Sequence, residues 1–209
     1  MERWLALLQW AQSNRWIVED DYDSELRYDG RPIPALAGLK GAEGPVVYLG
    51  TFSKMLFPGL RLGYLIAPAR LVDAFAGAKL LADRHAPGAA QAILADFMAG
   101  GHYDAHIRRI RLMFAARRAV LLAECAARLA AFGAVVPQDQ GMHVLFRFHC
   151  PVDDVALARA LQAEGVEVRA LSPFYHGLRT EAGFLLGFGS FTGAEIKAAV
   201  AVIAARLAA

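Results

Sequence analysis

The stretch Gly50-Thr51-Phe52-Ser53-Lys54 decides the fold class of this 209-residue sequence, because of what surrounds the lysine. It follows the apolar run Pro45-Val46-Val47-Tyr48-Leu49, and Arg61 comes seven residues after Lys54. Upstream, the cluster Glu19-Asp20-Asp21-Tyr22-Asp23 ends another apolar run, Trp16-Ile17-Val18. Each part alone is a weak signal. The order of strand, acid, strand, hydroxyls, lysine and arginine is much less common by chance.

The residues around the lysine suit a phosphorylated aldehyde, and pyridoxal 5'-phosphate (PLP) is the cofactor that fits them. The Lys54 amine can condense with the aldehyde to form a Schiff base and can later shuttle protons. A phosphate dianion needs hydroxyls and preferably a guanidinium. Thr51, Ser53 and Arg61 supply these groups.

The acidic cluster suits the cofactor ring. The pyridine nitrogen must stay protonated if the ring is to withdraw electrons, and an ionised carboxylate beside it favours the protonated form. Asp20 or Asp21 can provide that carboxylate, and Tyr22 can hydrogen-bond the ring hydroxyl.

Each signal also has a simpler interpretation. A lysine in a loop is usually a solvated surface charge, and an acidic cluster after a strand usually closes a turn or caps a helix. The spacing G-x-x-x-x-G-K-[ST] is absent around Lys54, so the stretch is no P-loop.

Three segments, Val18–Pro32, Tyr48–Tyr64 and Gly101–Arg111, closely resemble the aminotransferase-like domain of MocR-type proteins. These are GntR-class bacterial regulators in which a fold-type I, PLP-binding domain follows a winged helix-turn-helix. The likeness extends from about Trp4 to the C-terminus. It implies an α/β fold, with part of an aminotransferase large domain (a mainly parallel sheet with helices) followed by a small α/β C-terminal domain.

The resemblance also implies a role for each candidate residue. Lys54 takes the Schiff-base position, Asp20 the pyridine-nitrogen position and Tyr22 the ring-hydroxyl position, with Asp21 as the alternative to Asp20 if the strand register differs by one. The phosphate-side positions fall on Thr51, Ser53 and Arg61.

The resemblance covers only the second half of a fold-type I subunit. It does not include the winged helix-turn-helix of MocR-type proteins. The sequence therefore reads as a piece of a larger protein, whose parent is expected to carry the DNA-binding module. Cutting a central sheet leaves strand edges and apolar faces uncovered, which favours self-association. The subunits of the intact family pair, so a homo-oligomer is expected.

Composition agrees with a piece of a larger globule. Hydrophobic residues make up 56% and charged residues 20%, and the net charge of +2 is too weak to indicate nucleic-acid binding. Cys125 and Cys150 indicate no disulfide framework, so the cytosol is the expected compartment. Charges interrupt every apolar helical run before it reaches membrane-spanning length, and no residue spacing predicts a metal site.

The spacing of apolar residues and the positions of glycine, proline and capping residues predict the helices and strands. Buried strands are expected at 16–18, 46–49 and 62–66, and further strands at 142–148, 166–170 and 184–188. Helices are expected at 2–13, 70–82 (opened by Pro68), 88–99, 103–131 and 154–164 (capped by Asp153 and closed by Gly165). Thr192 and Glu195 predict a capping box at the start of the last helix. The predicted domains are 1–102, a connecting helix 103–134, and 135–209.

Three functions remain open: transaminase-type chemistry on an amino acid or amine, effector sensing for an attached DNA-binding module, and an inactive remnant. Substrate recognition is the weakest part of the prediction. In some MocR-type proteins a carboxylate-binding arginine follows a Gly-Phe pair, and in Gly187-Phe188-Gly189-Ser190 it is replaced by Ser190. Arg169 and Arg179 are the alternatives.

Overall fold

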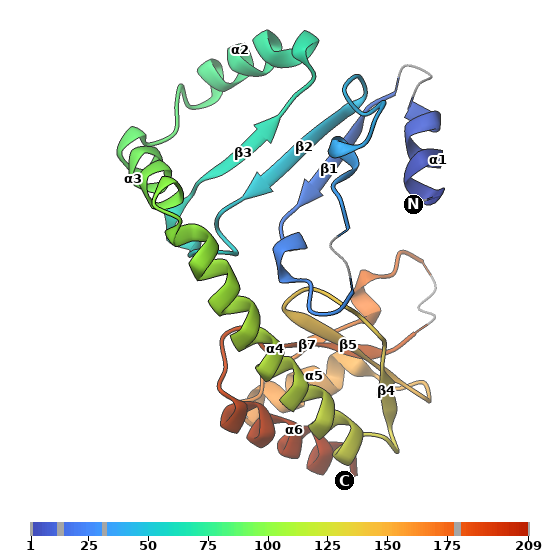
Figure 1. Ribbon diagram of the computed structural model, residues 1–209. Coiled ribbons are helices and arrows are strands. Elements are labelled where there is room, and N and C mark those ends of the chain that lie inside the picture. Colours follow the sequence, from blue (N-terminus) through green and yellow to red (C-terminus); the bar gives the residue numbers. More distant parts are fainter. Residues whose placement is uncertain (1, 12–14, 31–32, 178–180, 209) are drawn as a thin grey trace. The chain divides into compact units, whose positions relative to one another are not determined.

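The computed structural model describes residues 2–11, 15–30, 33–177 and 181–208, and separates into two compact units, Met1–Arg108 and Arg109–Ala209. Figure 1 follows the chain through them. Among the described residues, no helix is both long and apolar enough to cross a membrane.

The N-terminal unit is built on a three-stranded sheet with the order β1-β2-β3. Strands β1 and β2 are parallel, and β3 runs antiparallel to β2. Its helices and strands are α1 (Glu2–Ala11), β1 (Ile17–Asp21), β2 (Val46–Thr51), β3 (Gly63–Ile66), α2 (Val72–Ala82), α3 (Gly88–Ala99) and the start of α4 (His102–Arg128), with short 3-10 turns η1 (Ser24–Leu26), η2 (Leu36–Gly38), η3 (Pro58–Leu60) and η4 (Ala69–Leu71).

The core of this unit joins α1 to the sheet through the glycine-rich loop. Leu8 of α1 packs with Leu36, Ala42 and Val46 in one buried cluster. This loop spans residues 28–44, and η2 is the one helical turn in it among the described residues. Because the loop residues are apolar at these positions, they supply the contact that the short sheet needs on one face.

Two predicted strands differ from the structure in how they are buried. The run Trp16–Val18 was expected to be buried on both faces, but β1 extends to Asp21 and its burial alternates, with Val18 62% exposed. The strand predicted at 62–66 is β3, which is exposed at every residue. An apolar run is buried only where another layer covers it, and nothing within the described residues covers both faces of these strands.

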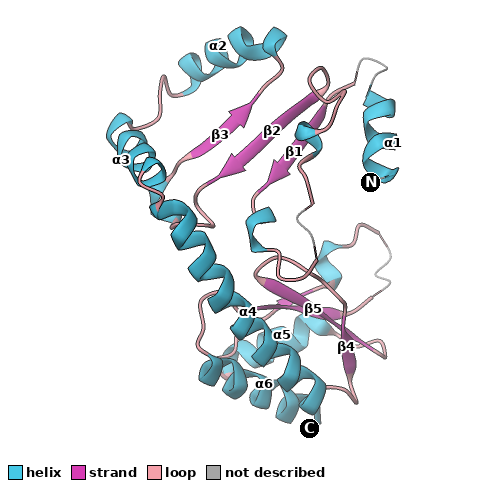
Figure 2. Cartoon of the chain, in the orientation of Figure 1, coloured by secondary structure: helices cyan, strands magenta, loops and turns pink. Residues whose placement is uncertain are grey.

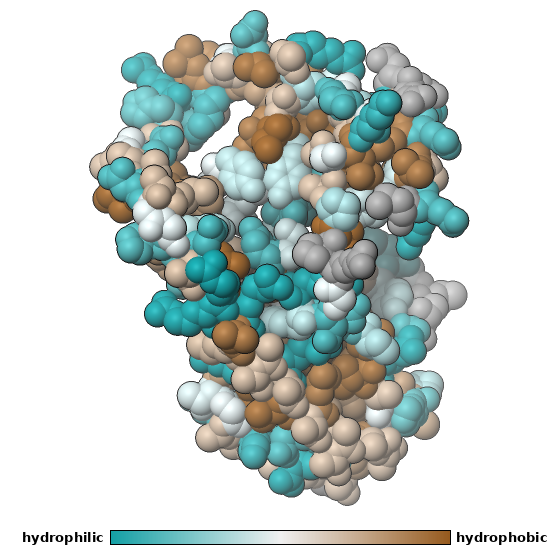
Figure 3. Space-filling view, in the orientation of Figure 1, coloured by the Kyte–Doolittle hydropathy of each residue, from teal (hydrophilic) through white to brown (hydrophobic). Residues whose placement is uncertain are grey.

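The apolar residues of helix α2 are also exposed. The helix spans Val72–Ala82 without one buried residue, and Leu81 is 89% exposed. Figure 3 shows such apolar residues reaching the surface of the N-terminal unit. Pro68 does not open α2, since it precedes the 3-10 turn η4 instead.

The C-terminal unit has a four-stranded antiparallel sheet in the order β4-β5-β7-β6. Helices α5 and α6 contact each other beside this sheet (Figure 2). The elements are β4 (Gly133–Val135), β5 (His143–Phe148), α5 (Asp154–Ala163), β6 (Arg169–Ala170), the 3-10 turn η5 (Ser172–Phe174), β7 (Gly183–Gly187) and α6 (Gly193–Ala208).

The core of this unit is built on the alternating side chains of β5. Val144, Phe146 and Phe148 are buried on one side of β5, and the Phe148 ring stacks edge-on against Phe184 of β7. Strand β4 was not predicted. Its Gly133 lies so close to β5 that a Cβ would come 2.3 Å from the carbonyl oxygen of Arg147.

The helix ends match the cap predictions closely. The Asp153 side chain accepts from the Ala156 N–H at 2.9 Å, and Gly165 follows the helix with φ +82°. At α6, the Thr192 N–H donates to Glu195 at 2.7 Å and the Thr192 hydroxyl accepts from the Glu195 N–H at 3.3 Å, which is the predicted capping box. The predicted 103–131 helix ends at Arg128, and the strand predicted at 166–170 shrinks to β6.

One buried carboxylate joins the elements of the C-terminal unit. Asp154 is 1% exposed and accepts backbone N–H groups of Leu171 (3.1 Å), Ser172 (2.9 Å) and Gly183 (3.0 Å), together with the Ser172 hydroxyl. Burial by itself raises the pKa of Asp154, but the hydrogen bonds from Ser172, Gly183 and Leu171 outweigh it and hold the pKa below its usual value.

Replacing this carboxylate is expected to destabilise the C-terminal unit. Asp154→Ala leaves three buried N–H groups without an acceptor, which costs about 3 kcal/mol of unfolding free energy. The measurement is urea unfolding followed by far-UV circular dichroism, with hydrogen exchange of the β7 amides to localise the effect. Glu167→Ala, at an exposed carboxylate of the same unit, is the matched control.

The wild type and the Asp154→Ala variant also test the pKa of this carboxylate. A carboxylate with a lowered pKa stabilises the folded state above its unfolded pKa and loses this contribution as pH falls through the folded pKa. The stability difference between wild type and Asp154→Ala should therefore be constant above about pH 4 and narrow below it. A difference that grows on acidification contradicts the lowered pKa.

Candidate cofactor site

The pleat of β1 divides the acidic cluster between two faces of the sheet. Successive strand residues point to opposite sides, so Glu19 and Asp21 lie on one face and Asp20 on the other. Ile17, Glu19 and Asp21 are half-buried, whereas Val18, Asp20 and Tyr22 are exposed. The cluster was expected to follow the strand, but its first three residues, from Glu19, are part of β1 itself.

The half-buried carboxylates of Glu19 and Asp21 make structural hydrogen bonds. Glu19 accepts the N–H groups of Leu36 and Ala37, at 2.7 and 2.8 Å, and so fixes the start of η2. Asp21 accepts the hydroxyl of Tyr48 at 2.8 Å and the N–H of Ser24 at 3.2 Å. The simpler interpretation of an acidic cluster, that it caps turns, therefore holds for these two residues.

Asp20 and Tyr22 are left facing outward. Asp20 is paired with Leu49 across the parallel ladder, and Thr51, two residues beyond Leu49, points to the same side of the sheet. Tyr22 continues the alternation just past the end of β1. The exposed face of this strand pair thus presents a carboxylate and a hydroxyl, with a phenol at its margin.

Lys54 lies in a single turn that follows β2. The Leu56 N–H donates to the Phe52 carbonyl at 2.9 Å, and the Phe52 N–H donates to the Leu62 carbonyl at 3.1 Å. The Lys54 side chain is exposed, and no hydrogen bond or ion pair to its amine occurs within the described residues. The Thr51 hydroxyl oxygen accepts the Ser53 N–H at 3.1 Å, which leaves the hydroxyl proton of Thr51 for another acceptor.

Arg61 has an uncommon backbone conformation. It follows η3 with φ 52° and ψ 30°, the left-handed region that a residue with a side chain seldom adopts. Such a conformation costs on the order of 1 kcal/mol and is often found at functional sites. Arg61 is an exposed residue.

Gly50 brings β3 close to this region from the other face. A Cβ at Gly50 would lie 2.3 Å from the ring of Tyr64, so only glycine leaves room for the ring. The Tyr64 ring centroid is 6.0 Å from that of Tyr48 and 5.4 Å from that of Phe52. Burial, followed by hydrogen bonds to Asp21 and Tyr64, raises the pKa of Tyr48, so it remains a hydrogen-bond donor.

The sequence prediction missed the supporting residues. Tyr48 and Tyr64 lie in the quoted motif, but only the strand register shows that they pack together beneath Gly50. His106 lies in the third quoted segment, and its Nε2 is 2.7 Å from the Met55 carbonyl oxygen. The period-two pattern of β1 could have identified Asp21 as the partner of Tyr48, had the strand been predicted to reach it.

The basic run of α4 is partly structural. In the run Arg108, Arg109, Arg111, Arg117 and Arg118, Arg117 donates to the carbonyl of Gly189 and Arg118 to that of Gln138. Gly189 precedes Ser190, the residue expected from the resemblance to stand where some MocR-type proteins have a carboxylate-binding arginine. Arg169 is exposed on β6, and Arg179 lies outside the described residues.

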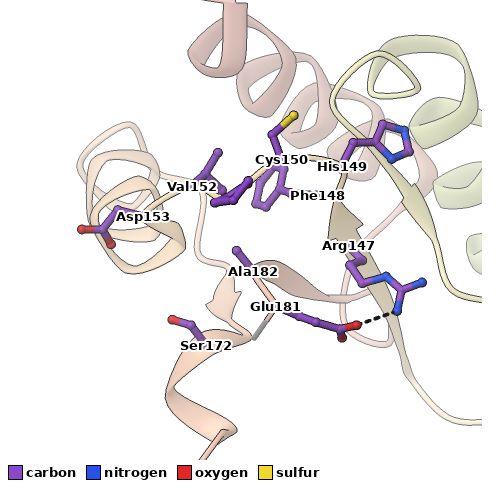
Figure 4. Close-up of a pocket in the computed structure, with 10 residues that line it drawn as sticks. Arg147, Phe148, His149, Cys150, Val152, Asp153, Ser172, Glu181 and Ala182 are labelled. Carbon is purple, nitrogen blue, oxygen red and sulfur yellow. Dashed lines mark hydrogen bonds and ion pairs between the residues drawn. The ribbon is translucent and has the colours of Figure 1, made fainter. Parts of the chain in front are cut away.

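A pocket of about 650 Å³ lies in the C-terminal unit, but none of the predicted site residues lines it. Figure 4 shows Arg147 and Glu181 facing each other at its edge, joined at 2.9 Å. Because the two charges neutralise each other, the pocket presents no unpaired charge from this pair to a ligand. Among the residues that the structure describes, no group of three or more His, Cys, Asp or Glu side chains could hold a metal ion.

The sequence resembles both regulators and enzymes. It is 40% identical over 189 residues to the probable rhizopine catabolism regulatory protein MocR of Rhizobium meliloti, covering 90% of this chain and 38% of that protein. It is 37% identical over 220 residues to the HTH-type transcriptional regulator TauR of Rhodobacter capsulatus, covering 99% and 43%. The chain thus spans less than half the length of these relatives.

The backbone matches solved aminotransferases. Kynurenine aminotransferase of Pyrococcus horikoshii superposes with a TM-score of 0.88 at 25% identity, over 100% of this chain and 52% of that one. The α-aminoadipate aminotransferase LysN of Thermus thermophilus gives 0.87 at 25% identity, over 98% and 53%. These matches confirm the predicted fold, part of a fold-type I aminotransferase. Since residues 1–203 also match the family described as aminotransferase class I and II, the chain belongs to that family.

Proposed function

We propose that this chain forms the lysine-bearing half of a PLP site in an aminotransferase-like domain. The observation that carries the proposal is the division of the acidic cluster by β1. Glu19 and Asp21 are engaged in structural hydrogen bonds, whereas Asp20 is exposed on the same face of the sheet as Thr51. Lys54 follows Thr51 by three residues, with an exposed amine.

The residues present fit the cofactor by their chemistry. PLP supplies an aldehyde that reacts with amines and a ring that withdraws electrons. Lys54 would hold the aldehyde carbon and carry a proton on its amine. Asp20 would keep the proton on the pyridine nitrogen by charge pairing. Tyr22 would donate to the ring hydroxyl.

The phosphate would be bound by residues at the end of β2 and just after η3. Thr51 has a hydroxyl proton to donate, Ser53 offers a second hydroxyl, and Arg61 brings a guanidinium that can bind two phosphate oxygens at once. The αL backbone of Arg61 supports this role, since a strained conformation is retained where it positions a functional group.

The expected substrate is a small amino acid or amine. The solved relatives named above act on kynurenine or α-aminoadipate according to their names, which supports an amino acid. Ser190 is exposed, and the guanidinium of Arg117 donates to the neighbouring carbonyl of Gly189. We infer that the large-domain part spans 1–102, the connecting segment, which is mostly α4, spans 103–134, and the small domain spans 135–209.

A second function is effector sensing for a transcriptional regulator. The specific observation in its favour is the 40% and 37% identity to the two regulators. The same site would bind the amino compound, and the output would be a change in conformation that reaches an attached DNA-binding domain. Turnover separates the two functions: amino-group exchange with a panel of amino and keto acids supports the enzyme, and binding without exchange supports the sensor.

Cofactor trapping tests the site itself. After incubation with PLP and reduction with borohydride, peptide mass spectrometry should find the pyridoxyl adduct at Lys54, because its amine is exposed beside the phosphate donors. Lys54→Ala should lose the adduct, whereas Lys40→Ala, at an exposed loop lysine, should keep it. Labelling spread over surface lysines and unchanged in Lys54→Ala contradicts the proposal.

The two neighbouring aspartates should separate binding from stability. Asp20→Ala is expected to weaken PLP binding about tenfold, with little change in the melting temperature. Asp21→Ala removes the acceptor of Tyr48 and Ser24 and should cost about 1 kcal/mol of unfolding free energy, with a smaller effect on PLP affinity. Absorbance titration and thermal unfolding measure the two quantities, and the reverse pattern makes Asp21 the ring partner.

Self-association is expected of the chain alone. The exposed β3 edge and the uncovered apolar residues of α2 favour pairing between copies. Size-exclusion chromatography with light scattering should give a mass above 22.6 kDa that falls on dilution. A sharp monomer peak at every concentration would show that these surfaces do not associate.

A further inference from the structure

The turn that carries Lys54 depends on α4 for one of its hydrogen bonds. A single helical turn leaves the carbonyl groups at its C-terminal end without partners inside the turn. Met55, directly after Lys54, is 1% exposed, so water does not reach its side chain. The Met55 carbonyl oxygen lies 2.7 Å from His106 Nε2 of α4, and His106 thereby satisfies an acceptor that the turn itself cannot.

A second contact comes from the same face of α4. Tyr103 precedes His106 by three residues, a spacing that places both side chains on one side of a helix. The Tyr103 ring lies edge-on against Phe52, with centroids 6.0 Å apart and planes at 81°. Burial raises the pKa of Tyr103 to about 12, so the ring is uncharged at neutral pH.

The two contacts bracket the lysine. Phe52 precedes Lys54 by two residues and Met55 follows it, and Phe52 also packs on Tyr64 of β3 at 5.4 Å. The backbone on both sides of Lys54 is therefore fixed by α4, while the lysine side chain stays exposed. This arrangement is expected when the orientation of a reactive amine must be fixed by packing and hydrogen bonds around it.

We propose that His106 is a positioning residue for Lys54, acting through its hydrogen bond to the Met55 carbonyl. The proposal rests on the proposed role of Lys54 at the cofactor. Because the acceptor is a carbonyl, Nε2 must carry a proton, and both the neutral Nε2–H tautomer and the imidazolium provide it. Tyr103 assists by holding the Phe52 ring on the other side of Lys54.

Two pairs of variants test the hydrogen bond separately from the packing. His106→Gln places an N–H donor near the position of Nε2, whereas His106→Asn has the same amide on a shorter side chain that does not reach. His106→Leu removes the donor and keeps apolar volume. Tyr103→Phe, which keeps the ring contact with Phe52, is the control on the same face of α4.

The first readout is borohydride trapping of PLP at Lys54, measured together with the pH dependence of the cofactor absorbance. His106→Leu and His106→Asn should lower the trapped fraction about tenfold and shift the pH profile, because a small displacement of a reacting group costs one to two orders of magnitude. His106→Gln and Tyr103→Phe should resemble the wild type. A wild-type result for His106→Leu or His106→Asn, or equal loss in His106→Gln and His106→Asn, overturns the proposal.

Two further measurements keep the test decisive. If His106→Leu fails to fold, as judged by circular dichroism, the Gln and Asn pair decides. If the wild-type chain traps no PLP at Lys54, the proposed cofactor role fails by itself, and His106 is then tested without cofactor. The rate of Lys54 acetylation relative to Lys40 should change severalfold in His106→Asn but not in His106→Gln, and an unchanged ratio overturns the positioning role.

Discussion

The candidate site depends on the pairing of β1 with β2 in one register. Strand side chains alternate between faces, so this register assigns four consecutive polar residues, from Glu19 to Tyr22, to two different tasks. Glu19 and Asp21 are turned toward loop amides and the Tyr48 hydroxyl, and they hold the protein together. Asp20 and Tyr22 remain exposed on the side to which Thr51 points. A slip of one residue would exchange the two sets.

The lysine turn shows the same division between function and support. Lys54 itself makes few demands on the fold, since its side chain is exposed. Its neighbours carry the structural contacts: Phe52 packs between Tyr64 and Tyr103, and Met55 is buried with its carbonyl bound by His106. Gly50 makes this possible, because the absence of a Cβ lets the Tyr64 ring cross β2 at close range. The exposed Lys54 side chain and the α4 residues that contact its turn therefore come from separate parts of the N-terminal unit.

The elements with local signals were predicted well. Asp153 and Gly165 bound α5 as expected, Thr192 and Glu195 form the capping box of α6, and β5 buries Val144, Phe146 and Phe148. These features depend on residues a few positions apart, so the sequence contains all that they need. Burial in the N-terminal unit was predicted poorly. Val18, β3 and α2 are apolar but exposed, because burial depends on a covering layer that the described part of this chain does not provide.

The sequence by itself determined the order of the candidate groups: a lysine after a strand, hydroxyls and an arginine near it, and carboxylates at a neighbouring strand. That order indicated PLP, and the resemblance of three segments to a known family indicated the aminotransferase fold. The order of residues along the chain can be read from the sequence without knowing which residues are in contact. Only the tertiary structure decided between Asp20 and Asp21 as the exposed carboxylate, and only it brought His106 to Met55 across 51 positions of sequence. Both outcomes depend on strand register and helix packing, and these are set by contacts between residues that no local pattern connects.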